Sequence, residues 1–558
     1  MPKVQIINRM GVTIFDSTIG ATHFKLKNIP VGNNTLIIED DNEGKVERVI
    51  NVTPTSQKIL VGLSRPDLTW RVNYPLATPS TNKQEITALY GIKKLNAVTD
   101  LGLVGDGVTD NYTKLVAGLK RSITEAIEIY FPKGNYYYRG PDNGRIELWP
   151  DRSKGLKFVG ETGATLLPEH NRTINQQDGY TMQLRFTSDS KGFQMENMII
   201  DGINSPQDIY KNPDAVTNTT IPALKGISVE GTKEVLVKNC TFKNLFGGGA
   251  ILIENFDQFD IHHCTLNRVG GNAWTENIGY GIYVSGHIGD AIVNIDSVEA
   301  QGYTDPAYPK LVGWVGIVFE NGSMQSANRD NWLQDANTYF NITNSTFADY
   351  ETGWHVETVA GNTYWNSDNV KYRCNNYAIY AGNWGEVKEA SNNIYVQLLP
   401  FGRTGLISGM YYTEKEQTKN ESGLNDFRMY NSTIDVIDVP GFGDVFQTMS
   451  YGNGVVSRYY NTTFNNVPNY FVVNGATELV NSRVNLKPNN PLSDTQLKSG
   501  LFNRPSQFVT LTSTPITRTG SYSSATEGAK PAKVKNTGYV PPYIPGPLGP
   551  ATLDREQD

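Results

Sequence analysis

A glutamate recurs at the same place in a short apolar phrase of this chain. The phrase reads GISVEG at 226–231, AILIEN at 250–255, GIVFEN at 316–321 and GWHVET at 353–358. Side chains of a strand point alternately to its two sides, so Ile317 and Phe319 should face inward and Val318 and Glu320 outward. A serine replaces the acid in GIYVSG at 281–286. The alternation therefore predicts one outward column made of Glu230, Glu254, Ser285, Glu320 and Glu357.

Carboxyl groups in this arrangement are suited to hydrolysing a glycosidic bond. That reaction needs two of them across the bond, about 5–5.5 Å apart in retaining enzymes and about 6.5–9.5 Å apart in inverting ones. If the phrases are neighbouring coils about 4.8 Å apart, Glu320 and Glu357 lie near the retaining distance, and Glu254 lies about 9.6 Å from Glu320. We therefore take Glu320 and Glu357 as the first catalytic pair and Glu254 as the alternative partner. The competing interpretation is an exposed acidic strand face whose carboxylates are only solvated.

Aromatic and polar residues near these glutamates are candidates for binding a sugar. Six of the eight tryptophans lie within 274–384, and aromatic rings stack on the apolar faces of sugar rings. The long stretches between phrases, at 267–280, 303–315 and 323–340, predict loops on one part of the repeat, where binding residues usually lie. Each tryptophan is alternatively a loop anchor or a core residue. The candidate substrate-binding residues are Trp274, Trp314, Trp332, Trp354, His355, Arg329 and Tyr283.

The stretch FDQFDIHH at 256–263 concentrates two acids and two histidines. A metal site would need these side chains to converge, but strand alternation sends them in different directions. We therefore expect no metal site and no cofactor.

The phrases belong to a repeat. From Glu230 they advance by 24, 31, 35, 37 and 25 residues, and a second column containing NCTF, HCTL, NSTF, NSTI and NTTF alternates with them. A unit near 24 residues with insertions predicts a parallel β-helix in which each unit is one coil. Cys240 and Cys264 should then lie one coil apart as buried thiols. Turn side chains of the second column should hydrogen-bond from coil to coil, and these are Asn239, His263, Asn344, Asn431, Asn461 and Asn481.

The rest of the chain is organised around this repeat. Residues 1–75 alternate apolar and polar over short runs, which predicts a small β domain. Residues 76–154 contain a linker and a capping segment with a helix, and residues 155–490 form the β-helix. Residues 491–558 contain further strands and a Pro/Gly-rich tail.

Composition excludes several classes of function. The net charge is −7, without the basic clusters of a nucleic-acid-binding protein. No run approaches the roughly 20 apolar residues of a membrane span, and the N-terminal stretch has no apolar core of a secretion signal. Three cysteines do not make a disulfide scaffold. We expect no nucleic-acid partner and no membrane span.

The segment GDGVTDNYTKLVAGLKRSI, at 105–123, contains apolar residues at every fourth position from Leu115, which predicts an amphipathic helix with Thr109 or Asp110 as its N-cap. With IYFPKGNYYY at 129–138, this segment resembles the cap of the right-handed β-helix in pectate-lyase-like proteins. Asn111 departs from the second acid of that motif. Together with the small N-terminal β domain and the missing secretion signal, the chain resembles bacteriophage tailspikes and capsular depolymerases.

The resemblance implies an all-β right-handed parallel β-helix, a homotrimer, and an N-terminal domain that attaches to a phage tail or baseplate protein in the virion. It also implies an endoglycosidase that recognises and hydrolyses a bacterial surface polysaccharide (capsule, O-antigen or exopolysaccharide) at the host cell surface. Two alternatives remain on the same fold. One is a polysaccharide lyase, which an acidic face suits badly, and the other is an adhesin that binds sugar without cleaving it.

Overall fold

The computed structural model describes a small N-terminal sheet and a long solenoid. Residues 53–91, where the predicted linker begins, and the Pro/Gly-rich tail lie outside the described residues. The residues that the structure describes are 3–8, 13–18, 32–40, 44–52, 92–139, 146–169, 180–204, 225–245, 249–270, 279–285, 290–303, 313–320, 337–357, 362–383, 387–398, 404–411, 425–436, 447–451, 455–467, 472–473, 476–486, 509–512, 514 and 516–518.

The N-terminal sheet is antiparallel, with the strand order β2-β1-β3-β4. Its hairpin partners are in direct register, for example Ile38 opposite Val46. This sheet accounts for the alternating runs at the start of the chain. Its strands are β1 (Lys3–Asn8), β2 (Thr13–Thr18), β3 (Gly32–Asp40) and β4 (Gly44–Val52).

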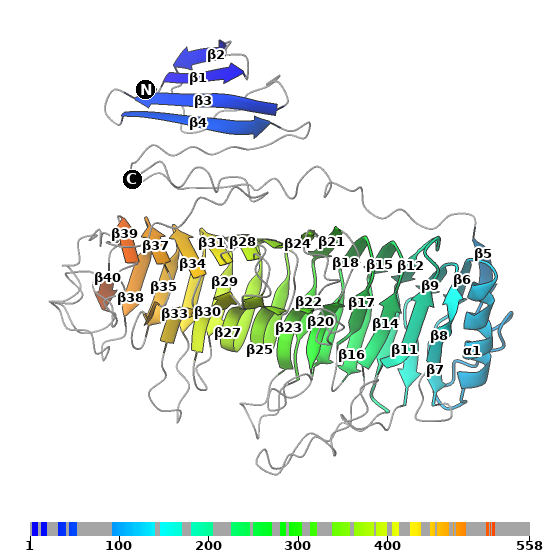
Figure 1. The fold of residues 1–558 in the computed structure, drawn as a ribbon. Coiled ribbons are helices and arrows are strands. Elements are labelled where there is room, and N and C mark those ends of the chain that lie inside the picture. Colours follow the sequence, from blue (N-terminus) through cyan, green and yellow to red (C-terminus); the bar gives the residue numbers. More distant parts are fainter. Residues whose placement is uncertain are drawn as a thin grey trace.

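The solenoid is a right-handed parallel β-helix, as the repeat and the resemblance predicted. The coils contribute strands to three parallel ladders, which we call the first, second and third faces. Figure 1 shows the coils stacked along one axis, from α1 at one end to β39 and β40 at the other.

The first face forms one parallel sheet. Its strands are β5 (Lys93–Asn96), β6 (Ile127–Phe131), β9 (Leu156–Gly160), β12 (Phe193–Glu196), β15 (Glu234–Lys238), β18 (Gln258–His262), β21 (Ala291–Asp296), β24 (Asn337–Thr343), β26 (Asn362–Asp368), β28 (Val387–Asn392), β31 (Asn425–Tyr430), β34 (Val455–Tyr460), β37 (Ala476–Val480) and β39 (Val509–Thr512).

The second and third faces join into a single sheet because β25 (Thr346–Glu357) and β27 (Lys371–Asn383) run through both. The other strands of the second face are β7 (Gly134–Tyr138), β10 (Ala164–Pro168), β13 (Ile199–Asp201), β16 (Thr241–Leu245), β19 (Thr265–Val269), β22 (Glu299–Gln301), β29 (Tyr395–Leu398), β32 (Thr433–Val436), β35 (Thr463–Val467), β38 (Arg483–Leu486) and β40 (Ile516–Arg518). Those of the third face are β8 (Ile146–Ser153), β11 (Tyr180–Phe186), β14 (Lys225–Glu230), β17 (Ile251–Glu254), β20 (Tyr280–Ser285), β23 (Gly313–Glu320), β30 (Thr404–Tyr411), β33 (Gln447–Tyr451) and β36 (Val472–Val473).

Inward side chains of the three faces form one continuous apolar core. Alternate strand residues supply it, so that Ile317 and Phe319 of β23 are buried in the core as predicted. Cys240 and Cys264 are also buried there, and the backbone N–H of Cys240 lies 3.4 Å from Sγ of Cys264, one coil on. The core stabilises the solenoid because each coil covers the apolar surface of the next.

The turn between the first and second faces is built on asparagine. The predicted turn residues Asn239, His263 and Asn344 have φ between 51° and 54°, a left-handed conformation that asparagine tolerates better than most residues. The side chains also bond along the stack, as Nδ2 of Asn461 donates to Oδ1 of Asn431 at 3.0 Å. The asparagine column is therefore confirmed as a structural ladder.

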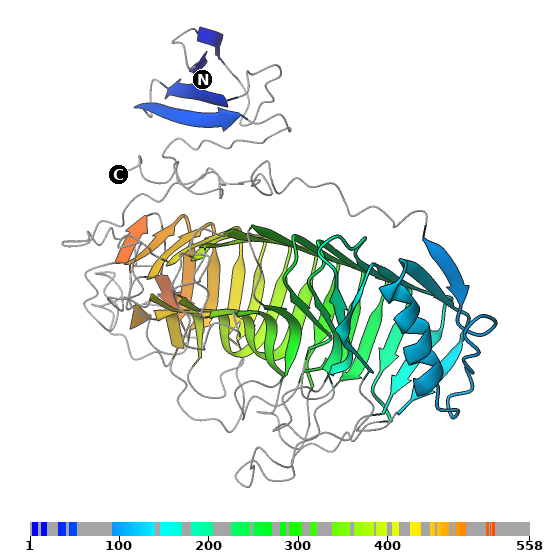
Figure 2. The same ribbon diagram turned by 45° about the vertical axis from the view of Figure 1, so that its right-hand side comes forward.

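The capping helix α1 spans Tyr112–Lys120 and lies across the end of the solenoid, which Figure 2 shows from the side. It is shorter than the predicted pattern, because the chain continues as a short 3₁₀ turn and Ile127 already belongs to β6. The N-cap is Asn111 rather than Thr109 or Asp110. Its side chain closes the preceding loop by bonding the backbone N–H of Val104 at 2.7 Å.

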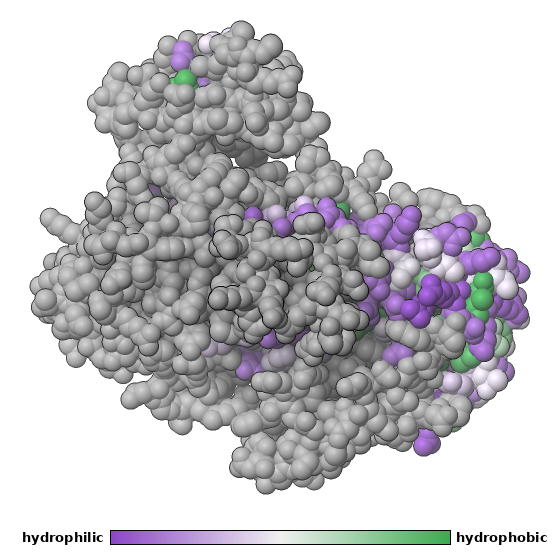
Figure 3. Space-filling model, viewed as in Figure 1, coloured by the Kyte–Doolittle hydropathy of each residue, from purple (hydrophilic) through white to green (hydrophobic). Residues whose placement is uncertain are grey.

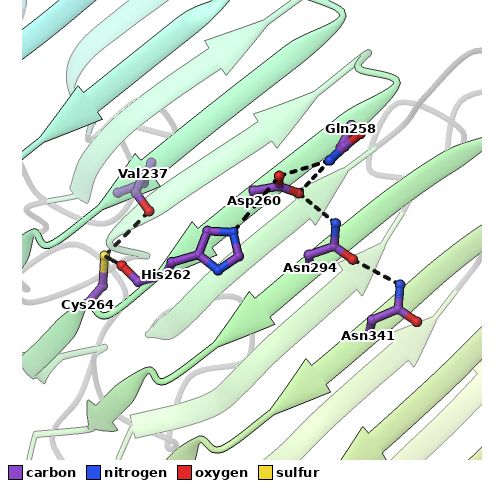
Figure 4. A network of polar contacts seen from close by, with 7 residues as sticks. All are labelled: Val237, Gln258, Asp260, His262, Cys264, Asn294 and Asn341. Carbon is purple, nitrogen blue, oxygen red and sulfur yellow. Dashed lines mark hydrogen bonds and ion pairs between the residues drawn. The ribbon is translucent and has the colours of Figure 1, made fainter. Parts of the chain in front are cut away.

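Polar side chains also form ladders on the outer surface of the first face (Figure 4). Nδ2 of Asn294 donates to Asp260 at 2.7 Å, and Nδ2 of Asn341 donates to Asn294 at 2.9 Å. Gln258 donates to both carboxylate oxygens of Asp260 at 2.9 Å. These bonds satisfy an aspartate that is only 1% exposed, so Gln258 and Asp260 of FDQFDIHH stabilise the stack.

The described surface near the capped end is mainly hydrophilic, with isolated hydrophobic spots (Figure 3). No helix in the described parts of the chain has the length and apolar character needed to cross a membrane.

Candidate active site

The outward column predicted from the repeated phrase is in register. Glu230 pairs with Glu254, Glu254 with Ser285, Ser285 with Glu320, and Glu320 with Glu357. Parallel strands in direct register stack equivalent residues about 4.8 Å apart. The third face therefore carries the five residues at consecutive levels, and Ser285 separates two pairs of glutamates.

Glu320 is the more enclosed acid of the second pair. Its side chain is 12% exposed and accepts a hydrogen bond from the Tyr283 hydroxyl at 3.2 Å. Burial raises the pKa of Glu320. His355 lowers it in part, the charge of Glu357 raises it further, and the hydrogen bond from Tyr283 lowers it. Such a shift favours the protonated form of the carboxyl group.

His355 lies between the two carboxylates. Its Nδ1 is 3.8 Å from Oε1 of Glu320, and its Nε2 is 3.1 Å from Oε2 of Glu357. The side chain is only 5% exposed, whereas that of Glu357 is 31% exposed. The site therefore opens toward solvent at Glu357, and the buried imidazole lies within reach of both carboxylates.

Aromatic rings enclose the imidazole. Trp314 meets it edge to face at 5.5 Å between ring centroids, and Tyr380 does so at 4.4 Å. Trp314 is itself partly buried and packs against Tyr280. These two ring contacts restrict the orientation of His355.

The outward side of β23 is covered, which the alternation pattern did not show. Val318 does point away from the core, but it is fully buried in a separate cluster with Tyr280, Tyr283 and Val315. The interpretation of the column as a set of solvated carboxylates is therefore wrong for Glu320. Large neighbours on the outer surface, rather than the core, remove it from water.

The first pair of glutamates has a different environment. Glu230 is 8% exposed, and its Oε1 lies 3.2 Å from the guanidinium of Arg185, its register partner on β11. Burial, then the charge of Glu230, raise the pKa of Glu254 to about 7, and Arg185 opposes the rise. Glu254 stands two levels from Glu320 with Ser285 between them, so the one-level pair Glu320 and Glu357 is the closer match to two cooperating carboxyl groups.

Trp354 does not belong to a binding surface. It is 0% exposed and stacks on Trp365 inside the solenoid, with 4.2 Å between ring centroids. The prediction that it binds substrate is wrong, because it precedes the outward His355 on β25 and alternation turns it inward. Trp274, Trp332 and Arg329 lie outside the described residues, so their predicted roles stay predictions.

The structure adds residues that sequence reasoning missed. Tyr380 is the register partner of His355 on β27, and Arg185 continues the glutamate column on β11. Both could have been found by extending the aligned phrase to AIYAGN and TMQLRF. Tyr280 precedes Tyr283 in an apolar run that predicted only a strand.

In the described part of the chain, one group of acids and histidines converges closely enough to hold a metal ion. It consists of Glu320, His355 and Glu357, with one ligand atom from each within 4.8 Å of the others. In FDQFDIHH, Nε2 of His262 lies 3.9 Å from Asp260, and this stretch forms no such group among the described residues.

Comparisons with known proteins give similarity only to solved structures. No protein-family model and no curated protein matches the sequence. PfbA, a surface adhesin of Streptococcus pneumoniae, is 12% identical with a TM-score of 0.41, over 77% of this chain and 94% of that chain. A tailspike mutant of E. coli bacteriophage HK620, in complex with a hexasaccharide, is 11% identical with a TM-score of 0.35, over 74% and 75%. The family 28 exopolygalacturonase of Yersinia enterocolitica is 11% identical with a TM-score of 0.29, over 92% and 93%. None of these values transfers a function to this chain.

Proposed function

We propose that this protein is an endo-acting glycoside hydrolase that binds and cleaves a bacterial surface polysaccharide. The observation that carries the proposal is the group Glu320–His355–Glu357, in which an enclosed carboxyl and a more exposed one stand one strand apart. Two carboxyl groups with different environments are what acid and nucleophile roles require.

Glu320 is assigned as the general acid because its burial favours the protonated form. It would donate its proton to the glycosidic oxygen as the bond to the anomeric carbon breaks. Glu357, which is closer to solvent, would attack that carbon to form a glycosyl ester. Water then displaces Glu357 after losing a proton to Glu320, which restores both groups.

His355 is assigned as a positioning residue. Its buried ring reaches both carboxylates, and Trp314 and Tyr380 restrict its rotation. The partly buried Trp314, which contacts His355, is an aromatic residue suited to packing on a sugar ring.

The setting of the enzyme is part of the proposal. The resemblance of the chain to tailspikes supports a homotrimer in a phage virion, with residues 1–75 bound to a phage tail or baseplate protein. The stacking of the coils supports a polymeric substrate, because consecutive strands of the third face repeat along the axis of the solenoid and could contact successive sugars.

Analysis of the products formed from purified surface polysaccharides tests the proposal. Capsule, O-antigen and exopolysaccharide preparations from a panel of bacteria would be incubated with the protein, and chain length and end groups measured. New reducing ends without unsaturation support a hydrolase. Ultraviolet absorbance from an unsaturated uronate would show a lyase, and binding without shortening would show an adhesin.

A further inference from the structure

The proposed catalytic group also has the composition of a metal-ligand set. Glu320, His355 and Glu357 provide two carboxylates and one imidazole whose ligand atoms lie within 4.8 Å of one another. Ligands about 2.0–2.2 Å from a tetrahedral metal ion such as Zn²⁺ lie roughly 3.4 Å apart. The 3.1 Å between Nε2 of His355 and Oε2 of Glu357 matches adjacent ligands.

The second observation is the imidazole itself. His355 is only 4% exposed, yet its Nε2 makes no hydrogen bond of normal geometry although it is close to Glu357. A buried polar atom without a hydrogen bond is costly and usually has a partner. Nε2 faces Glu357, with Glu320 on the adjacent strand, and one ligand atom of each of the three residues lies within 4.8 Å of the others.

Charge favours a cation at this point. In the described part of the chain, neither Glu320 nor Glu357 forms an ion pair with lysine or arginine, and His355 is the side chain that lies within ion-pair distance of both. When both groups are ionised, two stacked carboxylates repel each other. A dication would remove that repulsion and would give Nε2 a lone-pair acceptor.

We propose that Glu320, His355 and Glu357 bind a divalent transition-metal ion such as Zn²⁺, and that the bound ion inhibits the enzyme. The imidazole selects transition metals over Ca²⁺ and Mg²⁺, which prefer oxygen ligands alone. Inhibition follows because a metal-bound Glu320 cannot hold the proton that the leaving group needs. This second part rests on the proposed function, whereas metal binding does not.

Isothermal titration of the full-length protein with ZnCl₂, in the absence of sugar, tests the site. The wild type should bind with one specific site, and His355→Phe, which keeps a ring between Trp314 and Tyr380, should weaken binding at least tenfold. Glu357→Gln should do the same. His263→Asn is the matched control, because it removes an exposed turn histidine and keeps a residue suited to its φ of 52°. Circular dichroism and the melting temperature establish that each variant is folded.

Two results would overturn the site. One is the absence of any specific Zn²⁺ binding by the wild type, and the other is equal affinity for wild type and His355→Phe. Tighter binding of Ca²⁺ than of Zn²⁺ would overturn the assignment of metal class. In a separate arm, Zn²⁺ should reduce the release of reducing ends by wild type and chelator should restore it. If no polysaccharide is cleaved, the proposed function fails, and the titration still decides the metal site.

Discussion

Glu254 provides a measurable test of how far the outer column is removed from water. Its pKa is raised from 4.5 to about 7 by burial and by the adjacent Glu230. We predict that Glu254→Gln, which keeps the shape of the side chain and removes its titration, becomes progressively more stable than wild type as the pH rises from 4.5 to 7.

The sign follows from proton linkage. A carboxyl with a raised pKa in the folded state contributes its full stability below the unfolded value of 4.5, and loses it as pH rises through the folded value of about 7. The difference between the folded and unfolded pKa values of Glu254 corresponds to about 3 kcal/mol of stability, at about 1.4 kcal/mol per pH unit. An unfolding entropy near 2.1 cal/mol/K per residue gives roughly 1.2 kcal/mol/K for the chain, so the melting temperature should change by about 3 °C.

The assay is differential scanning calorimetry of both proteins at a series of pH values from 4 to 8. The Glu254→Gln variant should melt about 3 °C higher, relative to wild type, at pH 8 than at pH 4. Glu299→Gln is the control, because Glu299 is an exposed glutamate on β22, and its melting curve should follow that of wild type. Parallel curves for Glu254→Gln and wild type would show that Glu254 is solvated and that the account of its burial is wrong.

Three further predictions concern stability. Trp354→Ala should lower the free energy of unfolding by about 3–5 kcal/mol, measured by denaturant unfolding, because it empties a core site; a change near zero would contradict its burial. Asn344→Ala should melt lower than Asn344→Gly, because the turn has a φ of 51° and alanine there costs about 1–2 kcal/mol. Asp426→Asn should cost about 3–5 kcal/mol, because it leaves the buried Arg428 and Arg458 without their carboxylate. Burial alone would raise the pKa of Asp426, but the two arginines lower it to about 2. The extra stability of wild type over Asp426→Asn should therefore disappear as the pH falls from 4 toward 2.

Much of the architecture followed from periodicity. Strand alternation and a repeated phrase were enough to place Glu230, Glu254, Ser285, Glu320 and Glu357 in consecutive register, because parallel coils carry equivalent positions directly over one another. The asparagine turns were recognisable for the same reason. Each depends on local geometry that one coil repeats in the next.

The residues that cover the site could not be predicted from periodicity. Alternation gives the direction of Val318 and His355 but not what covers them, and their burial comes from rings that meet across strands. Trp354 was mispredicted for a different reason. Strand alternation already indicated that its side chain points inward, but the clustering of tryptophans near the glutamates was given more weight. The elevated pKa of Glu254 depends on that same cover and on a neighbour one coil away.

The most direct test of the account compares cleavage rates of Glu320→Gln, Glu357→Gln and Glu254→Gln on a polysaccharide that wild type shortens. The account predicts that the first two lose about 10²–10⁴-fold or more in the release of reducing ends, while Glu254→Gln keeps most of the wild-type rate and all three remain folded. Full activity in Glu357→Gln, together with loss in Glu254→Gln, would instead place the reaction between Glu254 and Glu320 and contradict the assigned pair.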